Sequence, residues 1–555
     1  LVAKDPLILS DKKKAQAPAL SNGVLAVGID AETTTATLYP MGIGDLEYPA
    51  SGLVAIGGKE LCSFTRSGDT LTLTRALRGT EAEEHDADDR VQLVLQYDSI
   101  SPANIVYDLL TTYTPGIDPN WIDLDEWTVE VDEYIDRLYS AEIAEPTPVV
   151  DLLNELIEQV GLVFWWDAVS QKIKLQSLRP VTDSARVYDE NRIIERTFKA
   201  TEQPQKRVSE VWTYYGMRNP LEPLDEPSNY KAAIATVDPE SSLDYANPAI
   251  KKIFSRWISD LNRGAASRIN AIILSRHRNA PRKFSFDLFN NCEPAPVLGN
   301  GFLLETWVLQ DDTGAASRVP AQFTSIEVRD DRYVTDAQES IFVAQEDLED
   351  VRLIFIDSDA FNVNLRTLHD SIYPAPESGD HIRCIISSSA TIGSSTSGPS
   401  FDVGSWVPGV NIEIVVNGRI LGRGGRGGGN VEEGQPGGTA LYTRFAVSVT
   451  NNGVIGGGGG GGSGLYFFDP IFGFFAAGGG GGAGALPGAA GNIPGAQPGT
   501  DTTGGAGVSG IGAGGNLGQP GGSVGPAGGA AGPAIDGISF VTLGVPGTIL
   551  GPQVN

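Results

Sequence analysis

Glycine is concentrated at one end of this 555-residue chain. Residues 421–555 hold 47 of the 69 glycines and 10 of the 34 prolines, so these two residue types make up about 42% of the segment. The segment also carries only three Arg and five Asp or Glu residues. Because a backbone without Cβ atoms is costly to order, such a segment is either a flexible linker or a fold in which backbones touch.

The stretches between the glycine runs favour an ordered fold. LYFFDPIFGFF at 465–475 and ISFVTLGVPGTIL at 538–550 are too apolar for a solvated linker. We therefore expect extended threefold helices like polyproline II, whose N–H and C=O groups pair between neighbouring helices. Collagen is excluded because glycine does not recur at every third position, and the calcium-binding nonapeptide is excluded because its Gly-x-Asp is missing.

An internal repeat runs through this region. Residues 411–429 are echoed by 445–462, with Gly418 and Gly453 aligned, and more weakly by 538–551. Each copy has an alternating apolar strand, a glycine, an isoleucine (Ile420, Ile455 or Ile549) and glycine again. Such a repeat predicts stacked units that cannot bury their apolar faces alone.

The whole chain is expected to be a multidomain α+β protein that is mostly β, ending in a tip of β-strands and polyglycine helices. The division into domains follows from strand-like runs in 20–100 and from two helix starts. At Ser101-Pro102 and Thr147-Pro148 an N-cap residue is followed by a proline in the first turn. The second helix has an apolar stripe over 149–160 and a stop at Gly161, and a longer helix is expected over 250–279. Turns at 299–301 and 311–314 indicate hairpins, and the Ser/Gly-rich stretch 387–400 indicates a linker or long loop. The predicted domains are 1–100 (small β), 101–184 (helix and hairpin), 185–346 (α+β), 347–420 (β stalk) and 421–555 (glycine-rich tip).

Charge and cysteine content exclude several classes of protein. The net charge is −29, and almost all of it lies in residues 1–420, so nucleic acid is not an expected partner. Three cysteines far apart (Cys62, Cys292 and Cys384) indicate neither a disulfide framework nor a zinc site. No apolar run is long enough to span a bilayer, and the N-terminus lacks the order of a signal peptide, so we expect a soluble body assembled in the cytoplasm. The start at Leu1 instead of methionine leaves a preceding segment open.

Residue patterns typical of catalysis are sparse. His85, His277, His369 and His381 have no partners at ligand or triad spacing, and no cofactor motif is present. Acidic clusters at 81–89, 123–127 and 132–136 offer carboxylate pairs for glycoside hydrolysis, and the first also offers a calcium site. Solvated faces are the commoner explanation for such clusters. We expect a protein that is not an enzyme and holds no cofactor.

The aromatic stretch in the glycine-rich segment is the candidate binding surface. It is either a small satellite core or an exposed apolar tip that docks on a partner. At 11 residues it is too short to span a bilayer, so stable membrane insertion is not expected, although a membrane-penetrating spike is a further alternative. The candidate receptor contacts are Leu465, Tyr466, Phe467, Phe468, Phe472, Phe474 and Phe475.

Three stretches resemble one family. TLTRALRGTEAEEHDADDRVQL (72–93) is similar to the RG..GT.a..H..gd.V segment of baseplate hub and tail-tip attachment proteins of long-tailed bacteriophages, the lambda-type tip family. Residues 145–180 resemble the helix-plus-hairpin element of these proteins, and 251–288 resemble a third segment. Where the family has glycine in the first motif, this chain has Asp88. Residues 401–555 resemble the glycine-rich adhesins at the tips of T-even-like long tail fibres.

These resemblances imply a structural virion protein at the phage tail tip. The family implies a homotrimer in which residues 1–346 form the hub that closes the tail tube, next to the tube, distal tail and tape measure proteins. Residues 401–555 would form a central tip whose loops, such as 465–475 and 485–503, contact a bacterial surface receptor. The alternative is a tip-located depolymerase or cell-wall hydrolase that uses a carboxylate pair.

Overall fold

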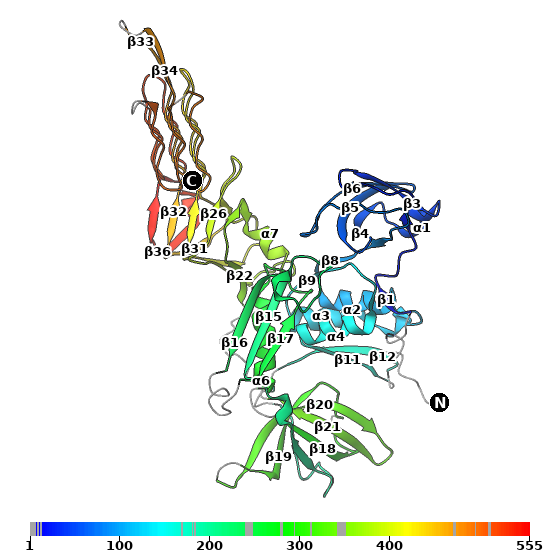
Figure 1. The fold of residues 1–555 in the computed structure, drawn as a ribbon. Helices are drawn as coiled ribbons and strands as arrows, with labels where there is room; N and C mark the ends of the chain where they lie inside the picture. Colours follow the sequence, from blue (N-terminus) through cyan, green and yellow to red (C-terminus); the bar gives the residue numbers. More distant parts are fainter. Residues whose placement is uncertain are drawn as a thin grey trace. The chain divides into compact units, whose positions relative to one another are not determined.

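The computed structural model divides the chain into two compact units, Leu1–Asp347 and Leu348–Asn555, each of which is mostly β (Figure 1). The structure describes residues 7, 10, 14–167, 170–179, 181, 185–238, 248–277, 281–293, 295–310, 313–340, 351–469, 473–493, 495–508 and 512–555. The mostly β fold class expected from the sequence is confirmed. The division into five domains remains a prediction.

The first unit begins with a small closed sheet in the order β2-β3-β6-β5-β4-β7. Its elements are β2 (Val24–Leu25), β3 (Thr35–Tyr39), α1 (Ile43–Glu47), β4 (Ser51–Ile56), β5 (Glu60–Ser67), β6 (Thr70–Thr74) and β7 (Val91–Leu93). A bridge between Val24 and Arg90 brings the first strand next to the last. Inward residues such as Leu38, Leu71 and Leu73 alternate with exposed threonines, as expected of a half-buried antiparallel strand.

A helical layer follows this sheet (Figure 1). Its elements are β8 (Leu95–Ile100), α2 (Pro102–Thr111), η2 (Pro119–Trp121), α3 (Leu124–Tyr134), β9 (Tyr139–Ile143), α4 (Val149–Val160), β11 (Leu162–Asp167) and β12 (Lys172–Ser177), together with the short pair β1 (Gln16–Ala17) and β10 (Thr147–Pro148). The helix expected over 149–160 is confirmed, and it ends at Gly161 in the left-handed conformation (φ 82°). The capping prediction at Thr147 is wrong, because Pro148 is the N-cap residue and the Thr147 hydroxyl donates to the Glu145 carbonyl.

The helix expected over 250–279 is in fact a strand followed by a helix. β17 (Ile250–Phe254) pairs in parallel with β15 (Glu210–Met217), which also pairs with β16 (Tyr230–Val237). Helix α6 (Arg263–His277) packs on β15 and β16. The ladder with β15 satisfies the backbone of 250–254, so tertiary pairing overrides the local helical pattern there.

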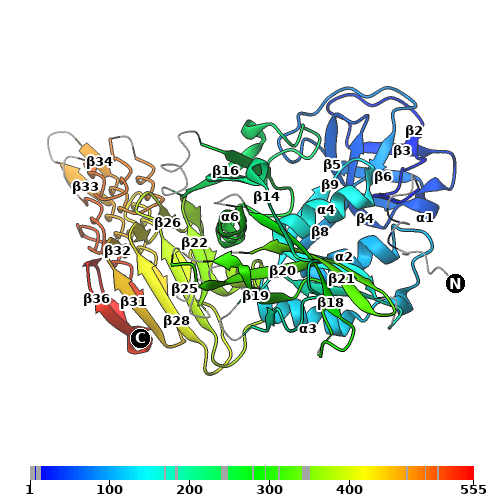
Figure 2. The same cartoon turned by 90° about the horizontal axis from the view of Figure 1, so that it is seen from below.

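A second six-stranded sheet completes the first unit, in the order β13-β19-β20-β21-β18-β14 (Figure 2). Its strands are β13 (Val187–Asp189), β14 (Lys199–Glu202), β18 (Arg282–Phe289), β19 (Gly301–Gln310), β20 (Ala316–Val328) and β21 (Arg332–Glu339). The hairpin expected at 311–314 is confirmed by the pairing of β19 with β20, although residues 311–312 lie outside the described residues. The turn at 299–301 does not make a hairpin, because β18 pairs with β14 and β21 instead of β19.

The second unit is a stack of strands in three all-parallel sheets of five strands each. The first sheet holds β22 (Val351–Ile356), β25 (His381–Ile386), β28 (Asn411–Val416), β31 (Val447–Asn451) and β36 (Val541–Val545). The second sheet holds β23 (Ala360–Phe361), β26 (Thr391–Gly393), β29 (Arg419–Leu421), β32 (Val454–Gly456) and β37 (Thr548–Leu550). The third sheet holds β24 (Val363–Asn364), β27 (Phe401–Asp402), β30 (Leu441–Tyr442), β35 (Ile535–Asp536) and β38 (Gln553–Val554). The chain therefore winds through five rungs of three strands, a β-solenoid. The stretch 387–400 is not a free linker, because it contributes β26 to the second rung.

The repeat found in the sequence corresponds to rungs of this solenoid. Ile420 is the register partner of Ile455, and Ile455 is the partner of Ile549. Ile420 and Ile455 are fully buried in the solenoid core. The aligned glycines are adjacent as well, since a Cβ on Gly453 would lie 1.9 Å from the carbonyl oxygen of Gly418. The predicted stacking of the repeats is confirmed.

Candidate functional site

The glycine runs leave two successive rungs of the solenoid, each between its second and third strands, and pack as a bundle of extended segments. One run begins after β29, and the longer one lies between β32 and β35. The amides of Gly422, Gly425 and Gly428 donate to the carbonyls of Gly456, Gly459 and Gly462. A step of three residues on both segments is the period of a polyproline II helix. The expected bundle of threefold helices is confirmed.

Residues 457–464 form a central helix of this bundle. The amides of Gly458 and Gly461 donate to Gly438 and Gln435, while those of Gly459 and Gly462 donate to Ala483 and Gly480. The third face, formed by Gly457, Gly460 and Ser463, donates to Leu550, Gln519 and Gly522. Each face of the helix therefore contacts a different neighbouring segment, and its amides donate hydrogen bonds to backbone carbonyls of those segments.

Close backbone approach explains why glycine is needed in this helix. A Cβ on Gly458 would lie 1.9 Å from the carbonyl oxygen of Arg423, and one on Gly461 would lie 2.0 Å from that of Arg426. These distances are far below any Cβ contact that real structures show. The bundle thus has almost no side-chain core and is held mainly by hydrogen bonds between backbones.

The hydrogen-bond ladder separates the turns of the bundle into two groups. Turns near 485, 500–504 and 516–518 lie at the solenoid end, because Gly422 and Gly484 bond to Gly456 and Thr500. Turns at 429–433, 465–477, 490–496 and 523–528 lie at the opposite end. Figure 1 shows the hairpin of β33 (Leu465–Asp469) and β34 (Gly473–Ala477) at that far end. We call the far group the distal turns.

The distal turns expose both apolar and acidic side chains, the latter including Glu432 and Glu433. Tyr466 is 44% exposed and Val431 is 56% exposed. Leu465 is partly buried, with its Cδ1 3.0 Å from the Cβ that Gly525 would carry in the neighbouring turn. Arg426 and Glu432 form a loose pair at 3.6 Å beside them.

The aromatic candidates lie on this hairpin. Phe467 pairs with Phe475 and Phe468 with Phe474 in the register of β33 and β34. Phe472 lies outside the described residues. The role of Leu465, Tyr466, Phe467, Phe468, Phe472, Phe474 and Phe475 in receptor contact remains a prediction.

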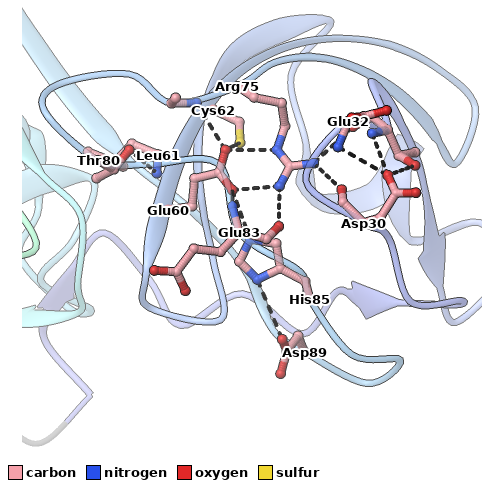
Figure 3. Close-up of polar contacts among 12 residues, drawn as sticks. Asp30, Glu32, Glu60, Leu61, Cys62, Arg75, Thr80, Glu83, His85 and Asp89 are labelled. Carbon is pink, nitrogen blue, oxygen red and sulfur yellow. Dashed lines mark hydrogen bonds and ion pairs between the residues drawn. The ribbon is translucent and has the colours of Figure 1, made fainter.

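In the first unit, the motif at 72–93 builds a buried charge network (Figure 3). Glu60 is fully buried and accepts two hydrogen bonds from Arg75, at 2.7 Å from Nε and 2.6 Å from Nη2. His85 Nε2 lies 3.0 Å from the same carboxylate, which also accepts from the amides of Ala76 and Glu83. Burial alone would raise the pKa of Glu60, but these donors hold it at about 2. The network ties β5 to the 75–89 loop and presents no group to solvent for chemistry.

The same loop contains Asp88, which stands where the resembled family has glycine. Asp88 adopts a left-handed backbone with φ of 70°, the conformation that glycine would provide. Its amide donates to the Leu25 carbonyl, so the turn closes the sheet against β2. Aspartate tolerates this region better than most residues, which explains how the turn survives without glycine.

Carboxylates in and near the acidic cluster at 123–127 serve as helix caps or ion pairs. Asp123 caps α3 by accepting from the amide of Glu126, and Glu126 pairs with Lys174 at 2.7 Å. Glu130 is paired with Arg179 and accepts from the amide of Ser177. Among the described residues, no cluster of three or more potential ligands could hold a metal ion. The described part of the chain also contains no helix with the length and apolarity to cross a bilayer.

Sequence reasoning identified the distal hairpin but missed two features. The 429–433 turn, with Val431, joins the distal group through backbone hydrogen bonds from Gly428 to Gly462 and from Gly464 to Glu432. Glu60 was not singled out, because its partners Arg75 and His85 lie 15 and 25 residues away. Neither relationship has a local sequence signal.

Comparison with known proteins gives a family match for the second unit. Residues 352–554 match the family model described as phage tail fibre adhesin Gp38. The gp37-gp38 adhesin tip complex of the bacteriophage S16 long tail fibre is similar over 39% of this chain and 83% of that chain, with 26% identity and a TM-score of 0.30. No curated protein matches the chain.

Solved tail proteins are similar to the chain over a larger share of its length. The prophage MuSo2 43 kDa tail protein from Shewanella oneidensis is similar over 57% of this chain and 94% of that chain, with 10% identity and a TM-score of 0.27. Prophage tail protein gp18 from Listeria monocytogenes is similar over 57% of this chain and 94% of that chain, with 9% identity and a TM-score of 0.27.

The match over 352–554 defines the class of domain in the second unit. The solenoid and glycine bundle together match a phage tail fibre adhesin domain, and this match supports a structural tail protein in host binding. The adhesin resemblance inferred from the glycine-rich sequence is confirmed.

Proposed function

We propose that this protein is a tail-tip hub whose distal turns contact the bacterial receptor during adsorption. The observation that carries the proposal is the agreement between the adhesin match over 352–554 and a bundle that gathers several turns at the end away from the solenoid. A scaffold held by backbone hydrogen bonds leaves the turns free to vary in sequence without loss of a core.

The chemistry of the distal turns supports docking on another surface. Tyr466 and Val431 are large exposed side chains in these turns, and Glu432 and Glu433 next to Val431 are exposed as well. Exposed apolar and aromatic side chains are typical of binding surfaces. Tyrosine also offers a hydroxyl, so it can satisfy a polar group at the edge of an apolar contact.

The receptor contacts are tested by phage adsorption. Phage with Tyr466→Ala combined with Val431→Ser should adsorb to host cells roughly tenfold more slowly, because two apolar contacts are lost. The matched control is Thr502→Ala, an exposed residue in a turn at the solenoid end of the same bundle. Equal loss in both variants, or no loss in the double variant, would refute the assignment of the distal turns.

The proposal includes a homotrimeric hub formed by residues 1–346, next to the tube, distal tail and tape measure proteins. The support is the resemblance of 72–93, 145–180 and 251–288 to tail-tip hub proteins. Light scattering of the purified chain should give a mass three times the 58.6 kDa of one copy. A monomer or dimer at all concentrations tested would contradict the trimer.

A further inference from the structure

A cavity of about 850 Å³ lies in the first unit, between hairpin β11–β12, helix α3 and strands β20 and β21. Its volume is within the range of small-ligand sites. All of its lining residues belong to the first unit, so the inference drawn from it does not rest on receptor contact by the second unit.

The floor of the cavity is one face of the β11–β12 hairpin. Trp165 is the register partner of Lys174, so both side chains lie on the same face. The neighbouring residues Phe164 and Trp166 pack against the hydrophobic core of the helical layer. The hairpin therefore packs Phe164 and Trp166 towards the helical layer and presents Trp165 on its opposite face. Trp165 lines the cavity, as does part of Trp166.

One wall presents hydrogen-bonding groups of both kinds. Lys174 Nζ donates to both carboxylate oxygens of Glu126, at 2.7 and 2.9 Å. Gln176 Nε2 donates to Asn300 Oδ1 at 2.7 Å. A carboxylate beside an ammonium, and an amide beside an amide, each place a donor close to an acceptor.

The opposite wall is mostly apolar, although Thr324 and Ser325 of β20 also line it. Val297 and Val328 are 42% and 70% exposed at the rim, and Tyr333 and Ile326 lie deeper against the core of the second sheet. Exposed apolar side chains around a cavity are typical of binding sites.

We infer that this cavity binds an uncharged oligosaccharide. A sugar ring has an apolar face of C–H groups that stacks on an indole such as Trp165, and its neighbouring hydroxyls both donate and accept, as the Glu126–Lys174 pair requires. The lining has three carboxylates and two cations, so it offers no excess of positive charge for an anionic ligand.

Glu126 and Glu130 each lie against a cation, Lys174 and Arg179. The carboxylate oxygens can also accept hydrogen bonds from the hydroxyls of a sugar. The inference is one of binding, and no cleavage of the ligand is proposed.

The test is titration of the full chain with two neutral probes, triacetylchitotriose and maltotriose, by calorimetry. Wild type should bind at least one probe saturably. Trp165→Ala should weaken that binding roughly tenfold, and Glu126→Gln, at an exposed ion pair that adds little stability, should weaken it roughly threefold. The probe should be recovered uncleaved.

The matched control is Trp307→Ala, a tryptophan that is 70% exposed on β19 outside the cavity. This variant should bind like wild type, and thermal unfolding should confirm that all variants are folded. The inference is overturned if wild type binds neither probe, if Trp165→Ala and Glu126→Gln both bind like wild type, or if Trp307→Ala loses binding as strongly as Trp165→Ala.

Discussion

Gly461→Ala should destabilise the second unit strongly. The new Cβ would lie 2.0 Å from the carbonyl oxygen of Arg426, 2.4 Å from its carbonyl carbon and 2.9 Å from the amide of Gly427. These atoms belong to backbone, so no side chain can move aside, and the two helices must separate by about 1 Å to relieve the contact.

The loss of stability can be worked out from the backbone hydrogen bonds at and beside Gly461. Gly461 donates to Gln435 and accepts from Gly529, and Gly428 donates to the adjacent Gly462. At about 1 kcal/mol for each of these bonds, with about 1–3 kcal/mol for overpacking, the loss is roughly 4–6 kcal/mol. For a unit of this size, that corresponds to a fall in Tm of roughly 10 °C or more.

Differential scanning calorimetry of the full chain measures this loss in the transition of the second unit. The control is Gly544→Ala in β36 of the same unit, where a Cβ meets nothing closer than 3.4 Å. Gly544→Ala should change stability by less than about 1 kcal/mol. If Gly461→Ala unfolds at the same temperature as this control, the glycine bundle is not packed as described.

Further predictions concern Glu60, the solenoid core and the turn at Asp88. Glu60→Gln should cost roughly 3–5 kcal/mol in urea unfolding, because Arg75 and His85 lose their buried partner. The pKa of Glu60 falls from 4.5 to about 2 on folding, which corresponds to a contribution of about 3 kcal/mol to the free energy of unfolding. This contribution is fully present above pH 4.5 and is lost as the pH falls towards 2. The difference in stability between wild type and Glu60→Gln should therefore shrink over that pH range. Ile455→Ala should cost roughly 2–5 kcal/mol in thermal unfolding of the second unit, whereas Ile549→Ala, in the partly buried last rung, should cost less. Asp88→Gly should raise the stability of the first unit by up to about 1 kcal/mol, because φ of 70° strains any residue with a Cβ; an unchanged or lower stability would contradict that account.

The sequence predicted those parts of the fold that depend on local pattern. The stripe over 149–160 has the period of a helix, and Ile420, Ile455 and Ile549 occur in copies of one local pattern of strand, glycine and isoleucine. The period of the glycine contacts was also predictable, because chains without Cβ atoms can pair their backbones only at close approach.

The complete solenoid could not be predicted in the same way. Its first rungs have strands of two residues, such as Ala360–Phe361 and Val363–Asn364, which carry no alternation to detect. The bundle interrupts two rungs between their second and third strands, so β32 and β35 are neighbours in one rung despite residues 457–534 between them. Pairing at such separations is set by tertiary contacts.

The candidate site could likewise be predicted from the sequence only where it depends on local pattern. The aromatic content of 465–475 marks the hairpin in the sequence, whereas the position of Val431 beside it depends on the pairing of two glycine runs. The acidic cluster at 123–127 is visible in the sequence, but its neighbour Lys174 on β12 is brought to Glu126 by packing of α3 on the hairpin.

The central claim is that the distal turns of the second unit bind the host surface. Host cells can be incubated with purified full-length protein before phage are added, and the adsorption rate constant then measured. Wild-type protein should block adsorption in a saturable way, whereas protein with 465–477 replaced by a Gly-Ser segment, and with an unchanged thermal transition, should need roughly tenfold higher concentration. Equal blocking by the two proteins would contradict the claim.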